Sequence, residues 1–301
     1  MTKPTNTQSE KRKSESLASR FSEKASENEN DVIFMKSSSD EGVIRNGGRN
    51  GARFAPQSLL SFFKKFNLNS KLAPKNFLEL EVSDSALERK DFNEAQAVET
   101  GKIQKILAAY SQATVFHLGG GHDHVYPLLS ALGKKHQDII VINIDAHADT
   151  RADDESHSGN PFRKFSDSFN GKFHLVQVGL HPFANSMSTM APLKQGKMSV
   201  IWKDEISKEK LSALITKEIK PDTFVLFSLD ADALCGHLVP GVSAVNGDGL
   251  NLDELKMIRE FYSELTLSHR PLVGIYELNP VYDTLSALSM RTMAGLLYDW
   301  L

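Results

Sequence analysis

Eight short apolar runs, rich in β-branched residues, recur along the chain and alternate with amphipathic stretches. The runs begin at residues 31, 76, 113, 138, 173, 198, 223 and 271. Helical periodicity lies between them, over 56–66, 86–109, 124–134, 205–218, 252–266 and 284–299. Strands that alternate with helices in this way are typical of a parallel sheet with helices on both faces. We therefore predict an α/β protein.

The alternation begins at Asp31 and continues to the end of the chain, which sets the expected extent of the folded domain. A chain of 301 residues fits one large α/β domain. We find no internal repeat and no second core within 31–301, so two domains are the less favoured alternative. Residues 1–30 are polar and carry few large apolar side chains. Because such a segment buries too little apolar surface to offset the entropy of ordering, we expect it to be flexible or loosely docked.

Composition argues against several classes of partner. The formal net charge is −3 and no Lys/Arg block stands out, so we expect neither nucleic acid nor an anionic membrane surface as a partner. No apolar run approaches the ~18 residues of a membrane span. The single cysteine, Cys235, and a polar N-terminus without a signal-peptide pattern indicate a cytoplasmic protein. A small-molecule substrate is the expected partner, and a homo-oligomer is an open alternative.

Metal-binding residue types directly follow four of the predicted strands. In open α/β sheets the ligand crevice lies beyond the carboxyl ends of the strands, so we look for chemistry there. The run at 113 leads into GGGHDH, whose glycines permit a tight turn before His122. The other candidates are Asp145, His147 and Asp149 after the run at 138, Asp230 and Asp232 after the run at 223, and Glu277 after the run at 271.

The segment VINIDAHADTR, residues 141–151, places Asp145, His147 and Asp149 at every second position. An extended chain points such residues to one side, and the small alanines between them allow close packing behind. DAD at 230–232 repeats this spacing with two carboxylates. Both segments can therefore present several ligands to one point.

Four carboxylates and two imidazoles crowded together need a compensating cation, because buried like charges otherwise force protonation. Oxygen and imidazole donors without thiolates suit Mn, Fe(II) or Zn. Six ligands exceed what one catalytic ion with an open position uses, and they suit two ions roughly 3.5 to 4 Å apart that share carboxylates. Each motif alone has a simpler explanation, such as a turn with an incidental histidine or an aspartate that caps a helix. Together, at successive strand ends, they favour a metal centre.

The stretches GGGHD, NIDAHADTR and SLDADAL resemble the metal motifs of the ureohydrolase superfamily, which contains arginases, agmatinases and formimidoylglutamases. The resemblance implies a three-layer α/β/α fold around an eight-stranded, mostly parallel sheet. It also implies two Mn2+ ions that serve the hydrolysis of C–N bonds in amidines or guanidines. The ligands that it implies are His122 and Asp149 for one ion, His147 and Asp232 for the other, and Asp145 and Asp230 for both.

Stretches outside the ligand set resemble the formimidoylglutamases in particular. They include SSSDEGVIRNGGRNGARFAP at 37–56, HSGNPFRKF at 157–165, VPGVSAV at 239–245 and YELNPVYD at 276–283. The resemblance implies hydrolysis of N-formimino-L-glutamate to L-glutamate and formamide, a step of histidine degradation. The substrate-binding residues that it implies are Arg151, Ser158, Asn160, Arg163 and Glu277.

Arg151 continues the alternation of the metal motif and carries a guanidinium suited to bidentate capture of a carboxylate. A formimino-glutamate presents a carboxylate, and agmatine does not. A salt bridge to Asp153 or Asp154 is the structural alternative for Arg151. Arg163 is a second candidate, although a surface arginine needs no function. RNGGRNGAR, residues 45–53, lacks the phosphate-loop pattern, and we expect it over the rim of the site.

The expected reaction uses a water molecule whose pKa two divalent ions lower toward neutrality. The resulting hydroxide attacks the formimino carbon. We expect Asp149 to relay a proton to the departing amine. The resemblance implies that Glu277 accepts the polarised formimino nitrogen, and the structural alternative is that Glu277 stabilises its loop through backbone bonds. His124 and His157 are further candidates for proton transfer, although a lone loop histidine such as His157 is more often solvated.

Some features depart from the patterns of the superfamily. Arginases carry an asparagine and a histidine where this chain has Arg151 and Phe162, so the substrate recognition of arginase is not reproduced. Members often follow the second Asp-x-Asp element with a further Asp-Pro, whereas here Asp232 leads into ALCGHLVPG. The alternatives are another ureohydrolase, such as a guanidinobutyrase, agmatinase or arginase-like enzyme, and a metal-binding pseudoenzyme.

Overall fold

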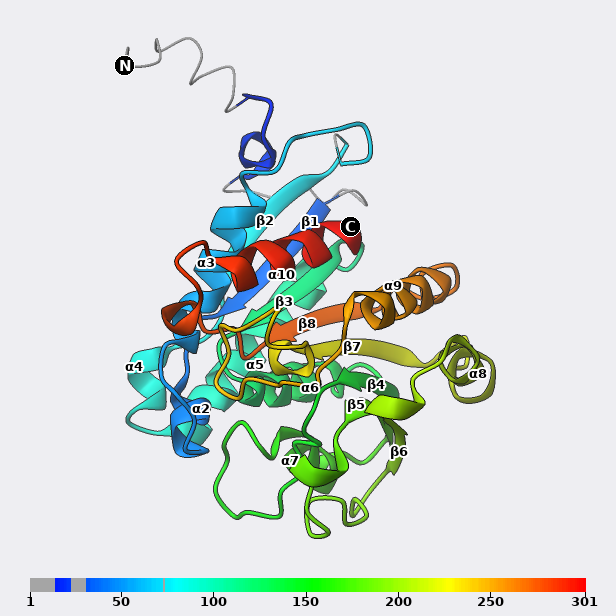
Figure 1. The fold of residues 1–301 in the computed structure, drawn as a ribbon. Coiled ribbons are helices and arrows are strands. Elements are labelled where there is room, and N and C mark those ends of the chain that lie inside the picture. The colour runs from blue at the N-terminus through cyan, green and yellow to red at the C-terminus, as the bar shows by residue number, and fades with distance from the viewer. Residues whose placement is uncertain (1–13, 23–30, 73) are drawn as a thin grey trace.

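The architecture is built on one eight-stranded sheet in which every neighbouring pair of strands is parallel (Figure 1). The computed structural model describes residues 14–22, 31–72 and 74–301. The strand order is β2-β1-β3-β8-β7-β4-β5-β6. The strands are β1 (Asp31–Ser37), β2 (Asn76–Glu81), β3 (Thr114–Gly119), β4 (Asp138–Ile144), β5 (Lys172–Leu180), β6 (Lys197–Trp202), β7 (Phe224–Asp230) and β8 (Leu272–Tyr276).

Successive residues of the central strands point into two separate hydrophobic clusters, one on each face of the sheet. In β1, Val32 and Phe34 belong to one cluster, while Ile33 and Met35 belong to the other. Both faces are buried, which explains why the strands read as continuous apolar runs rather than as alternating ones. The eight predicted strands are confirmed, with bounds that differ by one or two residues.

Helices cover both faces of the sheet and complete the predicted three-layer α/β/α fold (Figure 1). Four of them pack on the cluster that contains Phe34, and three pack on the cluster that contains Met35. The first set is α3 (Ala55–Phe63), α8 (Lys208–Glu218), α9 (Leu252–Leu265) and α10 (Leu288–Asp299), and the second is α5 (Phe92–Ala109), α6 (Val125–Leu132) and α7 (Pro161–Ser168). Within these layers α3 packs against α10, and α5 packs against α6.

The helices differ from prediction where polar residues interrupt the periodicity. The predicted helix over 86–109 is two helices, α4 (Ser85–Glu88) and α5, because the Asp91 side chain accepts the N–H of Glu94 and starts a new helix. Two helices were not predicted: α2 (Glu41–Arg45) and α7. Both are short, and Pro161 opens α7 at a position where its missing N–H has no cost.

Part of the N-terminal segment packs on the domain. Leu17, in the 3-10 helix η1 (Leu17–Arg20), is fully buried, and Phe21 stacks on Phe77 with ring centroids 5.1 Å apart. Residues 14–22 are therefore docked on the domain, which is the second of the two arrangements that we expected for this segment. The expectation also covers residues 1–13 and 23–30, which lie outside the described residues.

Candidate metal centre

Four adjacent strands in the middle of the sheet deliver the predicted ligands to one place. In the strand order, β3, β8, β7 and β4 are consecutive neighbours. The chain leaves their carboxyl ends at the GGGHDH turn, at Glu277, at the DAD motif and at the DAHAD motif, in that order. Segments far apart in the sequence therefore meet because parallel strands all end at the same side of the sheet.

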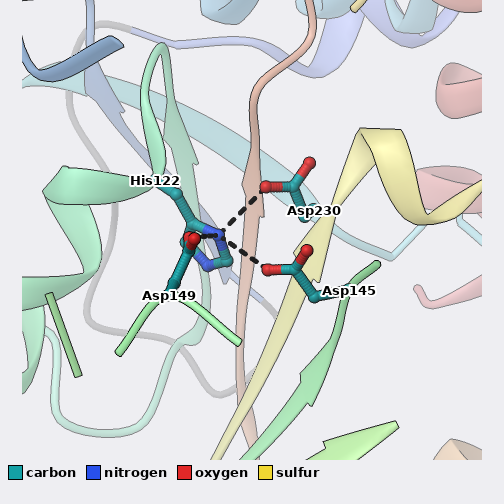
Figure 2. Close-up of side chains that lie close together, drawn as sticks. All are labelled: His122, Asp145, Asp149 and Asp230. Carbon is teal, nitrogen blue, oxygen red and sulfur yellow. Dashed lines mark hydrogen bonds and ion pairs between the residues drawn. The ribbon is translucent and has the colours of Figure 1, made fainter. Parts of the chain in front are cut away.

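Three carboxylates converge on one nitrogen of His122 (Figure 2). Its Nδ1 atom lies 3.0 Å from Asp149 Oδ2, 3.1 Å from Asp230 Oδ2 and 3.3 Å from Asp145 Oδ2. The other ring nitrogen, Nε2, lies 2.9 Å from the hydroxyl of Ser228, which fixes the orientation of the ring. A nitrogen surrounded by three carboxylate oxygens is an arrangement that a cation can occupy.

A second group shares Asp145 with the first. His147 Nδ1 lies 3.3 Å from Asp232 Oδ2 and 3.7 Å from Asp145 Oδ1. Asp145 thus faces both imidazoles through different oxygens. Asp230 lies beside the second group, since its Oδ1 accepts the N–H of Asp232 at 2.9 Å. The structure brings all six predicted ligands together, in two groups of which Asp145 is a common member.

The three ligands of the DAHAD motif are brought together by a turn. We had expected an extended chain that points alternate residues to one side, and that expectation was wrong. β4 ends at Ile144, and the Asp145 side chain accepts the N–H of His147 at 2.7 Å. Asp149 then adopts a left-handed backbone with φ of 51°, a conformation that aspartate tolerates better than most residues. The alanines between the ligands are buried as expected, with Ala148 donating its N–H to Asn185 Oδ1.

The ionisation of these residues is strongly perturbed. Burial raises the pKa of Asp149, and the neighbouring charge of Asp145 raises it further. Burial, together with the charge of Asp232, raises the pKa of Asp230 well above its ordinary value. The charge of Asp232 is the main cause that raises the pKa of His147 to about 11. Without a metal ion, bound protons compensate the negative charge of this cluster at neutral pH. A metal ion would replace those protons.

The residues present fit a binuclear divalent centre. They offer four carboxylates and two imidazoles without a thiolate, which is the donor set of Mn2+ and related ions. Asp232 Oδ1 is buried and has no hydrogen-bond partner among the described residues. A buried carboxylate oxygen that lacks a partner is costly, and a bound cation would remove that cost.

A cavity of about 800 Å3 opens over the ligands and defines where a substrate can lie. Its floor is formed by metal-site residues, and its walls carry polar side chains together with a few apolar groups. The lining includes His147, Asp149, Asp230, Asp232, Glu277, Arg151, Ser158, Asn46, Arg49, Asn185 and Ser243. A carboxylate-lined floor with an arginine above it can receive a substrate that has a cationic amidine at one end and an anion at the other.

Arg151 lines this cavity and is held by a residue that the sequence analysis did not single out. Its Nη1 donates to Asn46 Oδ1 at 2.6 Å, and Asn46 Nδ2 donates to the hydroxyl of Ser158 at 3.2 Å. Asp153, which we considered as a salt-bridge partner of Arg151, pairs instead with His157 Nε2 at 2.9 Å. Asn46 lies in the RNGGRNGAR stretch, so the expected rim loop was the signal that could have identified it.

The side chains of Arg163 and Asn160, which we predicted to bind substrate, contact backbone groups of the protein. The guanidinium of Arg163 donates to backbone carbonyls of Thr150, Ala191 and Pro192, at 2.6, 3.0 and 3.2 Å. The side chain of Asn160 bonds only backbone groups of the preceding loop. Neither residue lines the cavity. Ser158 does line it, as predicted.

Glu277 stands at the end of β8 in an uncommon backbone conformation. Its φ is 63°, which costs ~1 to ~3 kcal/mol for a residue other than glycine and is typical of functional sites. Oε1 accepts the backbone N–H of His122 at 2.9 Å. Burial is the main cause that raises the pKa of Glu277 to about 8. Because Oε1 is engaged with the backbone, Oε2 is the atom left to face a substrate.

The two additional histidines lie outside the cavity lining. His157 is buried rather than solvated, and its Nδ1 accepts the N–H of Gly159 at 3.0 Å. His124 is also buried, with Nδ1 at 3.0 Å from Glu99 Oε2. Neither lines the cavity.

The loop at 45–53 forms part of the cavity rim, as expected. Asn46, Gly47, Gly48 and Arg49 line the cavity. Arg49 is anchored across the opening because its Nε donates to the carbonyl of Ser243 at 3.1 Å. Gly47 has φ of 78°, a left-handed conformation that glycine adopts without strain.

Comparison with known proteins gives a consistent result. A model of the arginase family matches residues 31–301. Formimidoylglutamases from several Staphylococcus aureus strains are 30% identical over 271 residues, which cover 87% of this chain and 83% of theirs.

Solved structures agree with that assignment. A Trypanosoma cruzi formiminoglutamase with Mn2+ superimposes with a TM-score of 0.76 at 26% identity, covering 95% of this chain and 96% of that one. A Bacillus subtilis formimidoylglutamase has a TM-score of 0.80 at 21% identity, covering 95% of this chain and 90% of that one, which shows the shared fold.

Proposed function

The chain belongs to the arginase family, and we propose that within this family it is the hydrolase that converts N-formimino-L-glutamate to L-glutamate and formamide. The observation that carries this proposal is the position of Arg151 in the cavity above a complete set of six metal-ligand residues. The similarity to formimidoylglutamases supports the same substrate. The reaction is a step of histidine degradation.

The centre takes two Mn2+ ions. His122 and Asp149 would hold one ion, His147 and Asp232 the other, and Asp145 and Asp230 would contact both. When bound, the ions supply Lewis acidity and a water molecule with a pKa lowered toward neutrality.

Arg151 positions the substrate by its carboxylate. Asn46 occupies one N–H of the guanidinium and leaves the others directed to the cavity. A charge-assisted, bidentate hydrogen bond to a carboxylate contributes more than a neutral one. The hydroxyl of Ser158, which is tied to Asn46, adds a polar contact next to that carboxylate. These contacts fix the distance between the anionic end of the substrate and the metal-site floor, where the formimino carbon reacts.

Asp149 transfers the proton of the reaction, and Glu277 binds the cationic formimino group. Glu277 Oε2 accepts an N–H of the cationic formimino group, which orients the carbon for attack by water. Asp149 takes up a proton from the attacking water and returns it to the α-amino nitrogen of glutamate. The C–N bond to that nitrogen breaks, its electron pair stays with the amine, and the carbon leaves as formamide.

The proposal is tested with a panel of substrates on the Mn2+-reconstituted protein. N-formimino-L-glutamate should be hydrolysed with a kcat/KM at least ~100-fold above that of agmatine, which has no carboxylate. Guanidinobutyrate and L-arginine extend the panel, because both carry a carboxylate and release urea. Preferential release of urea would assign the chain to another ureohydrolase activity, and metal uptake without turnover of any member would identify a pseudoenzyme.

A cytoplasmic location goes with this proposal. One cysteine in 301 residues suits a reducing compartment. Within the described part of the chain, every helix is too short or too polar to cross a membrane.

A further inference from the structure

A second group of buried ionisable side chains lies behind the metal centre and outside the cavity lining. It consists of Glu88 at the end of α4, Glu99 in the middle of α5, and His124 in the 3-10 helix η3 (His122–His124). They are 2%, 1% and 1% exposed. One ligand atom from each lies within 4.8 Å of the others. These elements are separate in the sequence, and the group joins them.

The contacts within the group satisfy both oxygens of Glu99 and leave one oxygen of Glu88 without a partner. His124 Nδ1 lies 3.1 and 3.0 Å from the two carboxylate oxygens of Glu99. Ser37 Oγ donates to Glu99 Oε1 at 2.5 Å, and Ser39 Oγ donates to Glu88 Oε2. Glu88 Oε1 is buried and has no hydrogen-bond partner among the described residues.

Asp123 adds a third carboxylate beside the group. It is 1% exposed, and its Oδ2 lies 3.9 Å from His124 Nε2. Neither of its oxygens has a hydrogen-bond partner among the described residues. A buried carboxylate without hydrogen bonds is far more costly than a satisfied one. Glu88 Oε1 is the orphaned oxygen within the group, and the two orphaned oxygens of Asp123 lie beside it, which indicates that a component is missing here.

The charges point to a cation as the missing component. Three buried carboxylates share two imidazoles here: His124 lies 3.0 Å from Glu99 Oε2 and 3.9 Å from Asp123 Oδ2, and His117 Nε2 lies 3.8 Å from Glu99 Oε1. Two carboxylates and an imidazole without a thiolate form a donor set that suits Mn2+ or Zn2+. We propose that Glu88, Glu99 and His124 bind a third divalent transition-metal ion, distinct from the catalytic pair.

The position of this site gives the ion a structural role. His124 follows His122 by two residues in the same short helix, while Glu88 and Glu99 come from α4 and α5. An ion held by all three fixes that short helix against α4 and α5. The site therefore braces the turn that presents His122 to the catalytic ions, without contact with the substrate.

Metal content tests the proposal without reference to any substrate. The full chain is reconstituted with Mn2+ and desalted, and its total transition metal is measured by mass spectrometry. We expect three ions per chain. Glu88→Gln should lose one ion, while the matched variant Glu94→Gln, an exposed glutamate of α5, should keep all three. Asp230→Asn should lose metal from the catalytic pair and keep the ion beside Glu88.

Anomalous diffraction at the manganese edge locates the ions in the wild-type protein and does not depend on any variant folding. A peak between Glu88, Glu99 and His124, in addition to the catalytic pair, is the expected result. Two ions per chain and no peak at this group would overturn the proposal. Protons would then be what compensates the charge, because burial raises the pKa of Glu88 to about 7.

Discussion

The two ends of the sheet each carry a cavity of similar size, and only one of them is equipped for hydrolysis. The cavity at the carboxyl end has a volume of about 800 Å3, and the cavity at the amino end, beside the starts of β3, β7 and β8, has about 760 Å3. The first has four of the six metal-ligand residues in its lining, together with Glu277. The lining of the second, as far as the structure describes it, combines apolar groups with Lys134, Lys135 and Arg270 and contains no carboxylate.

The difference shows that volume alone does not identify an active site. Ligands gather at the carboxyl end because four neighbouring strands all terminate there in Asp, His or Glu. At the amino end β3, β7 and β8 begin with Thr114, Phe224 and Leu272, which line the second cavity. Substitutions at the two ends should therefore differ in kind, with chemistry lost at one end and stability lost at the other.

The largest contrast is expected between Asp230→Asn and His136→Gln. Asp230 faces His122 and the backbone of Asp232, so its neutralisation should weaken metal binding and lower kcat/KM by at least ~10³-fold. His136 lines the amino-end cavity, and its replacement should leave kcat/KM within ~2-fold. Steady-state kinetics with metal analysis checks both. An active, fully metallated Asp230→Asn protein would contradict the shared-ligand role.

Replacing an arginine should change substrate affinity at the carboxyl-end cavity and leave it unchanged at the amino-end cavity. Arg151→Ala should raise KM for N-formimino-L-glutamate by ~10-fold to ~100-fold with a smaller change in kcat, because a charge-assisted hydrogen bond contributes ~1.5 to ~3 kcal/mol. Arg270→Ala is the matched control at the other end and should leave KM unchanged. Inhibition by L-glutamate should weaken in parallel with KM in the first variant. An unchanged KM for Arg151→Ala would remove the carboxylate-binding role.

The side chains that accept hydrogen bonds from these two arginines can be compared in the same way, with smaller expected effects on KM. Arg151 donates to Asn46, and Arg270 donates to the side chain of Gln112 at 2.9 Å. Asn46→Ala removes one hydrogen bond and should raise KM by ~2-fold to ~10-fold. Gln112→Ala should change neither KM nor kcat. Equal effects of the two variants would mean that Asn46 does not position Arg151.

Leu132→Ala should have the smallest effect on catalysis and a clear effect on stability. Leu132 is 2% exposed and lines the amino-end cavity. Its truncation should lower the free energy of unfolding by ~2 kcal/mol or more without a change in kcat/KM. Denaturant unfolding and kinetics on the same sample measure the two quantities. A large loss of activity in the folded variant would mean that the two ends are coupled.

The fold was predictable because the strands are buried on both faces. Runs such as that from Asp138 to Ile144 are apolar throughout, and both hydrophobic clusters need them. Short elements were harder to predict. Helix α7 has eight residues, and its apolar Phe162 and Phe165 become recognisable only against the core that they join. The packing of Leu17 depends in the same way on a distant partner, the cluster around Phe34.

That the six candidate ligands meet was predictable, because parallel strands all end at the same side of the sheet. The walls of the cavity depend on loops that come together from different parts of the chain, and their contacts are harder to predict. Arg163 is a guanidinium in a plausible position by sequence, yet the carbonyls that bind it lie in the distant loop at 189–192. Asn46 reaches Arg151 across 105 positions. Local spacing does not encode contacts of that range.

The identity of the products of N-formimino-L-glutamate tests the central claim most directly. Attack by water on the formimino carbon can expel either of two nitrogens, and the groups placed around Arg151 and Asp149 favour loss of the α-amino nitrogen. Nuclear magnetic resonance of the Mn2+-reconstituted reaction should therefore show L-glutamate and formamide in equal amounts. N-formyl-L-glutamate with ammonia, or no turnover by the fully metallated protein, would contradict the account.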